Sequence, residues 1–271
     1  MKPGNALVIG ASSGIGEATA QLLEKRGYRV YGTSRYWPDP TVQASFSMLG
    51  CDVTQDASVR ETVRAVCERE GSLDAVINCA GFGLCGALEE VSGDDLRAQF
   101  EVNVIGTQRL LQAVLPVMRR QHKGHFLVVS SIAGRVGLPF QGPYCASKFA
   151  LEGLIESLQM EVNQEGIHVT LIEPGNVDTP FTEKRIVARE PDSPYGERLD
   201  AALSVIEADE RGGVSAAHVA QHIMSILERR HPPMRSVVGP LAERAALPLQ
   251  ALLPARLFAA GLAHHYKRLR H

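Results

Sequence analysis

The 271-residue sequence has few of the features that mark secreted, membrane-spanning or metal-binding proteins. It contains five cysteines, no C-x-x-C motif and no cysteine–histidine grouping at zinc spacing, which excludes a disulfide scaffold and predicts no metal site. Free thiols are typical of a reducing compartment, so we expect a cytoplasmic protein. No run of 18 apolar residues is present to span a membrane, and the apolar run before the first glycines is too short for a signal peptide.

The sequence also has no large excess of positive or negative charge. The sequence has 28 Lys and Arg against 30 Asp and Glu, a net charge of −2, and its one basic cluster is at residues 266–271. A phosphate backbone requires a clustered basic surface, so we expect no nucleic-acid partner. With 45% hydrophobic and 21% charged residues, the composition is ordinary for a soluble globular protein.

The sequence does contain a regular alternation of short apolar runs and stretches with helical spacing. The apolar runs predict strands at residues 5–10, 28–35, 73–81, 124–131, 167–175 and 235–239. Helices are predicted at residues 14–27, 56–71, 93–121, 144–166 and 215–230, the third kinked or broken at Pro116. Near-continuous apolar strands are typical of parallel sheets covered on both faces. The alternation therefore predicts an α/β fold, a Rossmann-like doubly wound parallel sheet with helices on both faces, in a single domain.

We assign residues 1–240 to this domain, and within it the polar, proline-rich segment 178–213 to a mobile substrate lid. Residues 241–271 form an Ala/Leu-rich helical tail that Pro248 and Pro254 interrupt. The tail has three interpretations: it packs on the domain or a partner subunit, it covers the substrate pocket, or its basic end makes a peripheral membrane contact. The histidines at positions 264 and 265 are expected to be solvated rather than ligands.

The first apolar run leads into "GASSGIG", a glycine-rich loop at the start of a helix. Gly10, Gly14 and Gly16 allow a tight turn and let a pyrophosphate approach the helix N-terminus, where free N–H groups favour an anion. Ser12 and Ser13 add hydroxyl donors. A plain strand-to-helix turn is the alternative, but the position after the first strand of an alternating chain favours a dinucleotide site.

Tyr144 and Lys148 are four residues apart in a predicted helix and therefore lie side by side on its surface. A simple surface contact is one interpretation. The other is chemical, because a nearby cation lowers the pKa of a phenol from its ordinary value of about 10. Tyr144 would then act as general acid for carbonyl reduction or as general base for alcohol oxidation.

These motifs and several others resemble, in sequence order, the short-chain dehydrogenase/reductase family over about residues 4–240. The stretch 130–158 is particularly similar to the hydroxysteroid and retinol dehydrogenase branch. The resemblance implies a homodimer or homotetramer. After the glycine spacing G-x-x-x-G-x-G, the matching motifs are "CDVT" (51–54), "NCAG" (78–81), "NVIGT" (103–107), "SSIAG" (130–134), "YCASK" (144–148) and "PGNVDTPF" (174–181).

The resemblance implies a catalytic set of Asn103, Ser131, Tyr144 and Lys148. The family places its serine 13 residues before the tyrosine, which selects Ser131 rather than Ser130. By the same resemblance, Ser131 would hold the substrate oxygen, Lys148 would bind the nicotinamide ribose, and Asn103 would hold a water in a proton relay. Without the resemblance, Ser131 reads as a strand-end cap and Asn103 as a helix residue that bonds its own backbone.

The cofactor is expected to be NADP(H) rather than NAD(H). NAD-binding sheets of this type place an acid at the end of the second strand, but here Ser34 stands in that place and Arg35 follows, suited to grip a 2′-phosphate. A solvated arginine is the alternative, as is a simple turn residue for Asp52. The residues implied in cofactor binding are Gly10, Ser12, Ser13, Gly14, Ile15, Gly16, Ser34, Arg35, Cys51, Asp52, Val53, Asn78, Ala80, Gly81, Tyr144, Lys148, Pro174, Gly175, Val177 and Thr179.

We expect an oxidoreductase that interconverts a ketone or aldehyde and an alcohol on a hydrophobic small molecule, such as a steroid, retinoid or aromatic carbonyl. The alternatives are reduction of a polar acyl-thioester or sugar carbonyl, an epimerase or dehydratase, and a non-enzymatic nucleotide-sensing or scaffold protein on the same fold. Cys145 is expected to be a packing residue, and Arg135 and Arg185 are within reach of an anion. The residues expected around the substrate are Phe82, Leu84, Ser131, Leu138, Phe140, Tyr144 and Phe181, with Val177 and Ile186 beside them.

Overall fold

A computed structural model describes residues 3–38 and 44–266. Its centre is a seven-stranded sheet with parallel pairings and the strand order β11-β7-β6-β4-β1-β2-β3. This confirms the predicted Rossmann-like fold and adds one strand, β3, that the sequence pattern did not predict. The strands are β1 Asn5–Ile9, β2 Arg29–Ser34, β3 Ser47–Gly50, β4 Ala75–Asn78, β6 Gly124–Val129, β7 Ile167–Pro174 and β11 Arg235–Val238.

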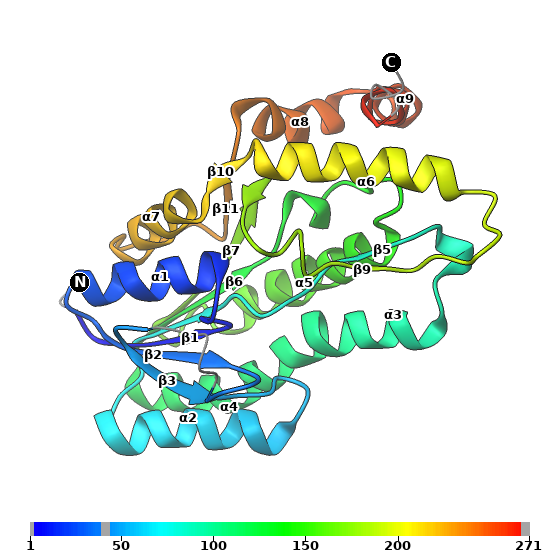
Figure 1. The fold of residues 1–271 in the computed structure, drawn as a ribbon. Helices are drawn as coiled ribbons and strands as arrows, with labels where there is room; N and C mark the ends of the chain where they lie inside the picture. The colour runs from blue at the N-terminus through cyan, green and yellow to red at the C-terminus, as the bar shows by residue number, and fades with distance from the viewer. Residues whose placement is uncertain (1–2, 39–43, 267–271) are drawn as a thin grey trace.

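Helices cover both faces of the sheet (Figure 1). α1 and α7 pack on one face, and α2, α4 and α5 pack on the other. The residues of β1 alternate between these layers, because Leu7 and Ile9 belong to the cluster with α2 and α4, whereas Ala6 and Val8 belong to the cluster with α1 and α7. These helices are α1 Gly14–Lys25, α2 Asp56–Glu70, α4 Gly106–Gln121, α5 Gly142–Glu161 and α7 Ala216–Leu227.

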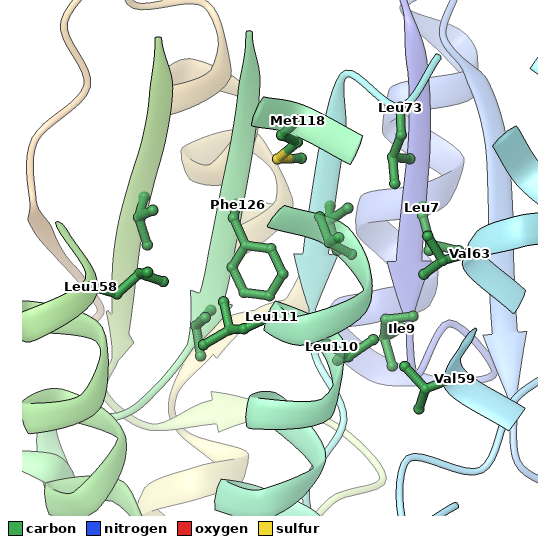
Figure 2. Packing of buried hydrophobic residues seen from close by; sticks show 14 of the residues in the cluster. Leu7, Ile9, Val59, Val63, Leu73, Leu110, Leu111, Met118, Phe126 and Leu158 are labelled. Carbon is green, nitrogen blue, oxygen red and sulfur yellow. The ribbon is translucent and has the colours of Figure 1, made fainter. Parts of the chain in front are cut away.

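Figure 2 shows the hydrophobic layer beneath α4. Phe126 of β6 is fully buried there and packs with Leu111 and Met118 of α4. Full burial of a side chain of this kind contributes about 1.5–3 kcal/mol relative to exposure. The layer therefore holds the sheet rigidly under α4 and α5. α5 carries the predicted catalytic residues Tyr144 and Lys148, and the π-helical segment directly before α4 carries Asn103.

The helix predicted at residues 93–121 is not a single helix. It consists of α3 (Gly93–Phe100), a π-helical segment (Glu101–Ile105) and α4. The predicted break at Pro116 is wrong, since Pro116 lies inside α4. Pro116 and Gln112 are both exposed, so the Gln112 carbonyl, which has no N–H partner at the proline, faces water instead. π-helical segments are frequent at functional sites, and this one carries Asn103.

The predicted lid, residues 178–213, consists largely of regular structure. Short strands anchor it, because β8 pairs with β10 and β9 pairs with β5. A helix, α6, supplies its second half. The remaining elements of this region are β5 Leu84–Cys85, β8 Val177–Asp178, β9 Ile186–Val187, α6 Gly196–Arg211 and β10 Val214–Ser215, with short 3-10 turns at Leu88–Glu90 and Ile132–Gly134.

The tail forms two helices, α8 (Leu241–Leu252) and α9 (Ala255–His265), which lie over α6 in Figure 1. Pro248 lies inside α8 and does not interrupt it, whereas Pro254 immediately precedes α9. Within residues 3–38 and 44–266, none of the helices has the length and apolar character needed to cross a membrane. The basic residues 267–271 lie outside the described residues.

Candidate active site

A cavity of about 1250 Å³ lies at the carboxyl ends of the central strands, where the strand order reverses between β1 and β4. Ligands of doubly wound sheets bind at this point. A pocket for one drug-sized ligand has a volume of about 300–1,000 Å³, so this cavity is large enough for a dinucleotide and a second molecule. With the exception of Asn78, all the residues predicted to bind the cofactor line it.

The loop between β1 and α1 requires glycine for two reasons. Gly10 and Gly14 have φ angles of +77° and +60°, a region that glycine adopts readily. A Cβ on Gly16 would lie 2.1 Å from the Gly10 carbonyl oxygen, so a side chain there would displace the loop. Ser13, at the N-cap of α1, makes no side-chain capping bond to the helix. The first N–H groups of α1 are therefore left for an anion.

The end of β2 forms the adenosine side of the cavity. Ser34 and Arg35 both line the cavity, and the Arg35 guanidinium carbon lies 4.5 Å from the ring centroid of Tyr36. Asp52 lines it as well, and its Oδ1 accepts hydrogen bonds from the Thr54 backbone N at 2.9 Å and the Thr54 hydroxyl at 2.8 Å. Asp52 therefore stabilises the turn that follows β3, as a turn residue would, and it also lines the cavity, as a cofactor-binding residue would.

The side chains of Ser131, Tyr144 and Lys148 meet in this cavity. Ser131 and Tyr144 share a side-chain hydrogen bond, and the Lys148 ammonium lies 5.7 Å from the centroid of the Tyr144 ring. Lys148 Nζ donates to the Val129 carbonyl at 2.9 Å, which ties the lysine to the end of β6. The end of β6 and one face of α5 thus bring a hydroxyl, a phenol and an ammonium together.

The predicted lowering of the Tyr144 pKa is wrong for the protein as the structure describes it. Burial raises the pKa of Tyr144 well above its ordinary value, while the hydrogen bond with Ser131 acts in the opposite direction. Burial also lowers the pKa of Lys148 to about 8, against the attraction of the Glu152 carboxylate. Because the phenol lies among cavity-lining side chains, its desolvation outweighs the neighbouring positive charge of Arg185, and Tyr144 keeps its proton.

Two predicted asparagines lie behind the cavity wall rather than in it. Asn103 is buried, its Oδ1 accepts from the Phe82 backbone N at 3.2 Å, and its Nδ2 donates to the Ser147 hydroxyl at 3.0 Å. Asn78 Nδ2 donates to the Thr107 hydroxyl at 2.9 Å. Asn78 does not line the cavity, and its side chain instead links β4 to α4 beside it. The water-holding role of Asn103 stays a prediction.

The substrate side of the cavity is mostly apolar. Phe82, Leu138 and Phe181 line it as predicted, and the Phe181 ring centroid lies 5.8 Å from that of Tyr144. Two predicted residues do not line it. Leu84 is fully buried in β5, and Phe140 has its ring centroid 6.4 Å from that of Tyr195. Leu84 pairs with β9, and Phe140 packs against Tyr195. Both contacts come from a segment far away in the sequence, so the spacing of residues around the predicted site does not predict them.

The two arginines expected within reach of an anion are paired. The guanidinium of Arg185 forms a buried ion pair with Glu210 of α6, and Arg135 Nη1 lies 3.3 Å from the buried carboxylate of Glu173. Lys184 is placed differently, because its Nζ donates to the Ser13 hydroxyl at 3.1 Å across the cofactor side of the cavity. The lid therefore adds a cation to the glycine-rich loop, a contact that the sequence pattern did not predict.

The tail helices form one wall of the cavity. Phe258, Leu262 and Tyr266 line the cavity from α9 and its C-terminal end, and Leu247 lines it from α8. Burial raises the pKa of Tyr266, and the nearby carboxylate of Asp209 acts in the same direction. Sequence reasoning missed these residues as site residues. The signal that could have found them is the spacing of Phe258, Leu262 and Tyr266, which places three large side chains on one helix face.

Two polar contacts hold this wall in place. Glu243 of α8 accepts hydrogen bonds from the backbone N of Asn176 at 2.8 Å and from its Nδ2 at 2.7 Å, beside the predicted P-G motif. His265 Nε2 lies 2.8 Å from Asp209 Oδ2 of α6. His265 is exposed, as expected, and the folded tail also brings it against a carboxylate. We name α8, α9 and Tyr266 the cap.

Fold and site together define a Rossmann-type oxidoreductase in which a phenol, a hydroxyl and an ammonium converge beside a dinucleotide cleft. The sequence profile described as short chain dehydrogenase matches residues 4–190, and the chain belongs to this family.

The relatives of the chain include hydroxysteroid and retinol dehydrogenases, the branch of the family that the sequence resembles. A 3-ketodihydrosphingosine reductase of Bacteroides thetaiotaomicron is 38% identical over 98% of this chain and 99% of that protein. The 17-beta-hydroxysteroid dehydrogenase type 1 of Mus musculus is 42% identical over 69% of this chain, which spans only 58% of that protein's length. Among solved structures, a short-chain dehydrogenase from Streptomyces avermitilis matches with a TM-score of 0.81 and 28% identity over 98% of this chain and 97% of its own.

Proposed function

We propose that this oxidoreductase uses NADPH to reduce the ketone of a long-chain amphiphile of the 3-ketodihydrosphingosine type, with Tyr144 as the general acid. The observation that carries the proposal is the cap, whose apolar inner residues Phe258 and Leu262 face the same cavity as Tyr144. An alignment that covers 98% of this chain includes α8 and α9, so the reductase from Bacteroides shares this region with it.

The lining residues fit a nicotinamide dinucleotide. The glycine-rich loop and the free N–H groups of α1 would hold the pyrophosphate, and Lys184 would add a cation there. Arg35 at the end of β2 favours NADPH over NADH, because its guanidinium suits a 2′-phosphate and no acid follows this strand directly. When bound, NADPH supplies the hydride that reduces the carbonyl carbon.

The protein's own residues would bind the carbonyl oxygen and deliver a proton to it. Ser131 and Tyr144 already share a hydrogen bond, and a carbonyl oxygen placed between them would accept from both hydroxyls. The raised pKa of Tyr144 keeps the phenol protonated at neutral pH, the form that reduction requires. As charge develops on the oxygen, the phenol proton moves to it, and the ammonium of Lys148, with its pKa lowered to about 8, is placed to restore that proton.

The chemistry of the cavity supports an amphiphile with a cationic head. 3-Ketodihydrosphingosine carries an amine and a hydroxyl beside its ketone, and a long alkyl chain. Asp209 and Glu210 of α6 line the cavity, and the charge of Glu210 is balanced by Arg185. Asp209, whose Oδ2 also contacts His265, would be the partner of an ammonium, while Phe181 and the cap would contact the alkyl chain.

The steroid or retinoid carbonyl predicted from the sequence stays the second candidate, because the steroid dehydrogenase of Mus musculus is the more identical relative where it matches, at 42%. A polar acyl-thioester is disfavoured, since Arg135 and Arg185 are both paired with carboxylates. A non-enzymatic role would not need Ser131, Tyr144 and Lys148 in one cavity. The cytoplasmic location and the homodimer or homotetramer stay predictions.

The test is NADPH oxidation by purified protein with 3-ketodihydrosphingosine, a steroid ketone and a retinal, each compared with the Tyr144→Phe variant. We expect the long-chain amino ketone to have the highest kcat/KM, and the variant to lose about 10²–10⁴-fold in kcat. The dissociation constant of NADPH, measured by fluorescence, should stay the same in the variant. A higher kcat/KM with the steroid ketone would favour the second candidate over the long-chain amino ketone. Cofactor binding without turnover of any of these substrates would refute both candidates.

A further inference from the structure

The charge of the chain is unevenly distributed between its domain and its tail. Residues 241–271 contain five Lys and Arg and a single acid, Glu243, a net charge of +4 in a chain whose total is −2. The first 240 residues therefore carry a net charge of −6. Glu243 does not offset the basic residues on the surface, because its carboxylate points inward to Asn176. The tail sequence is thus basic on an otherwise acidic chain, and among its described residues Arg244 and Arg256 are exposed.

The outer face of the cap is also unusually apolar. Leu241, Leu252 and Leu257 are 79%, 81% and 61% exposed, which places three large aliphatic side chains in water within two short helices. The exposed residues between them are mainly alanine and proline, with Arg244 and Arg256 as the exposed cations. Isolated exposed leucines are common on protein surfaces, but a contiguous apolar face bordered by cations marks a binding surface.

The inner face of the same helices is apolar as well, because Leu247, Phe258 and Leu262 line the cavity. A helix that is apolar on every side requires a nonpolar environment on both faces. The domain supplies this environment on the inner side only. The outer face therefore lacks its partner among the described residues.

We propose that the outer face of the cap docks on an anionic lipid bilayer, so that an amphiphilic substrate passes from the bilayer into the cavity beside it. The substrate part rests on the proposed function. Interfacial helices combine inserted leucines with basic residues at the level of the lipid head groups, and both are present here. A second copy of the chain is a poorer partner, because a two-fold contact through this face would bring the exposed Arg244 and Arg256 of two copies against each other.

The test measures binding to vesicles without substrate, which separates it from the proposed function. The full-length protein is floated with vesicles of phosphatidylcholine alone or of phosphatidylcholine with phosphatidylglycerol. The variant Leu252→Ser/Leu257→Ser removes two exposed apolar side chains, and neither of these residues lines the cavity. Leu88→Ser is the matched control, because Leu88 is 70% exposed on a different element.

We expect the wild type and Leu88→Ser to float with phosphatidylglycerol vesicles, less so at high salt, and the double variant to bind at least tenfold more weakly. All three proteins should reduce a short water-soluble ketone at the same rate. For substrate embedded in these vesicles, only the double variant should lose kcat/KM. Failure of the wild type to bind either vesicle, or equal binding by the double variant, would overturn the proposal. The oligomeric state in solution gives a further check. If the wild type is a dimer and only the double variant is a monomer, the outer face of the cap is a contact between copies and the proposal is overturned.

Vesicle binding without turnover of the long-chain ketone would refute the proposed substrate and leave the docking surface in place. Turnover of the long-chain ketone without vesicle binding would support the proposed substrate and overturn the docking surface.

Discussion

Glu152 of α5 and Glu173 of β7 point one carboxyl oxygen each at the same guanidinium in the interior of the protein: Glu152 Oε2 lies 3.6 Å and Glu173 Oε1 lies 3.9 Å from Arg235 Nε, and among the described residues neither oxygen accepts a hydrogen bond. Glu173 is fully buried and Glu152 is 5% exposed. Burial, followed by the charge of Glu173, raises the pKa of Glu152 to about 7, while the Ser130 hydroxyl and Arg235 act in the opposite direction. Glu152 lies one helical turn beyond Lys148, so a titrating carboxyl lies next to this proposed catalytic residue in α5.

The stability of the protein should depend on pH through this pair. A folded pKa of about 7 exceeds the ordinary value of 4.5, so the stabilising contribution is complete below pH 4.5 and is lost as the pH rises through 7. We expect the free energy of unfolding to fall across this window by an amount on the order of 2 kcal/mol. Glu152→Gln keeps the size of the side chain and removes the titration. Urea unfolding of both proteins at pH 5.5 and pH 8 checks this, and parallel losses in the two proteins would contradict it.

Arg35 should determine the choice of cofactor. Removal of a hydrogen bond to a charged group costs about 1.5–3 kcal/mol, so Arg35→Ala should lower kcat/KM for NADPH by about 10–100-fold. The value for NADH should change little, because NADH has no 2′-phosphate. Arg64→Ala is a suitable control, since Arg64 is an exposed arginine of α2 that pairs with Glu61. Equal losses with the two cofactors would show that Arg35 acts through the fold rather than through the phosphate.

Two glycines should respond to alanine in opposite directions. A Cβ at position 16 would lie 2.1 Å from the Gly10 carbonyl oxygen, whereas a Cβ at position 153 on α5 meets nothing within 4 Å. Gly16→Ala should weaken NADPH binding by roughly tenfold or more, because the anion-binding N–H groups are displaced. Gly153→Ala should raise the free energy of unfolding by about 0.5–1 kcal/mol through better helix propensity. Titration calorimetry and thermal unfolding measure the two effects, and tight NADPH binding by Gly16→Ala would refute the loop geometry.

The contact between Glu243 and Asn176 should affect the substrate more than the cofactor. Glu243→Ala removes both acceptors from the Asn176 backbone N and side chain and releases α8 from the wall of the cavity. We expect KM for a long-chain ketone to rise by roughly tenfold, with a smaller effect for a short ketone. Glu243→Gln keeps one acceptor oxygen and should lie between the wild type and Glu243→Ala. A uniform fall of kcat with unchanged KM in the alanine variant would place the role of Glu243 elsewhere.

The sequence predicts the parts of this protein that depend on short-range spacing. The glycine-rich loop and the Tyr144–Lys148 pair are set by local turns and one helical repeat, and both meet in the cavity. Hydrophobic runs were sufficient for six of the seven strands of the sheet. β3 was missed because its sequence, Ser47–Gly50, is only half-buried and carries little apolar signal.

Features that depend on contacts between distant segments were not predictable. Leu84 and Phe140 were assigned to the cavity, but β9 and Tyr195 cover them. The raised pKa of Tyr144 results from burial, which no spacing of a phenol and an ammonium reveals. Phe258 and Tyr266 reach the site only because α9 folds back over α6, a placement that depends on the Asp209–His265 and Glu243–Asn176 contacts.

The position of the cap after the last strand of the sheet has a consequence for synthesis of the protein. β11 is the final strand of the sheet, so the hydrophobic layers can form while α8 and α9 are still inside the ribosome. A nascent or prematurely terminated chain would therefore be folded and able to hold a dinucleotide, yet open to water where the ketone should lie. The apolar wall of the cavity would therefore be completed only when α8 and α9 have followed β11 out of the ribosome.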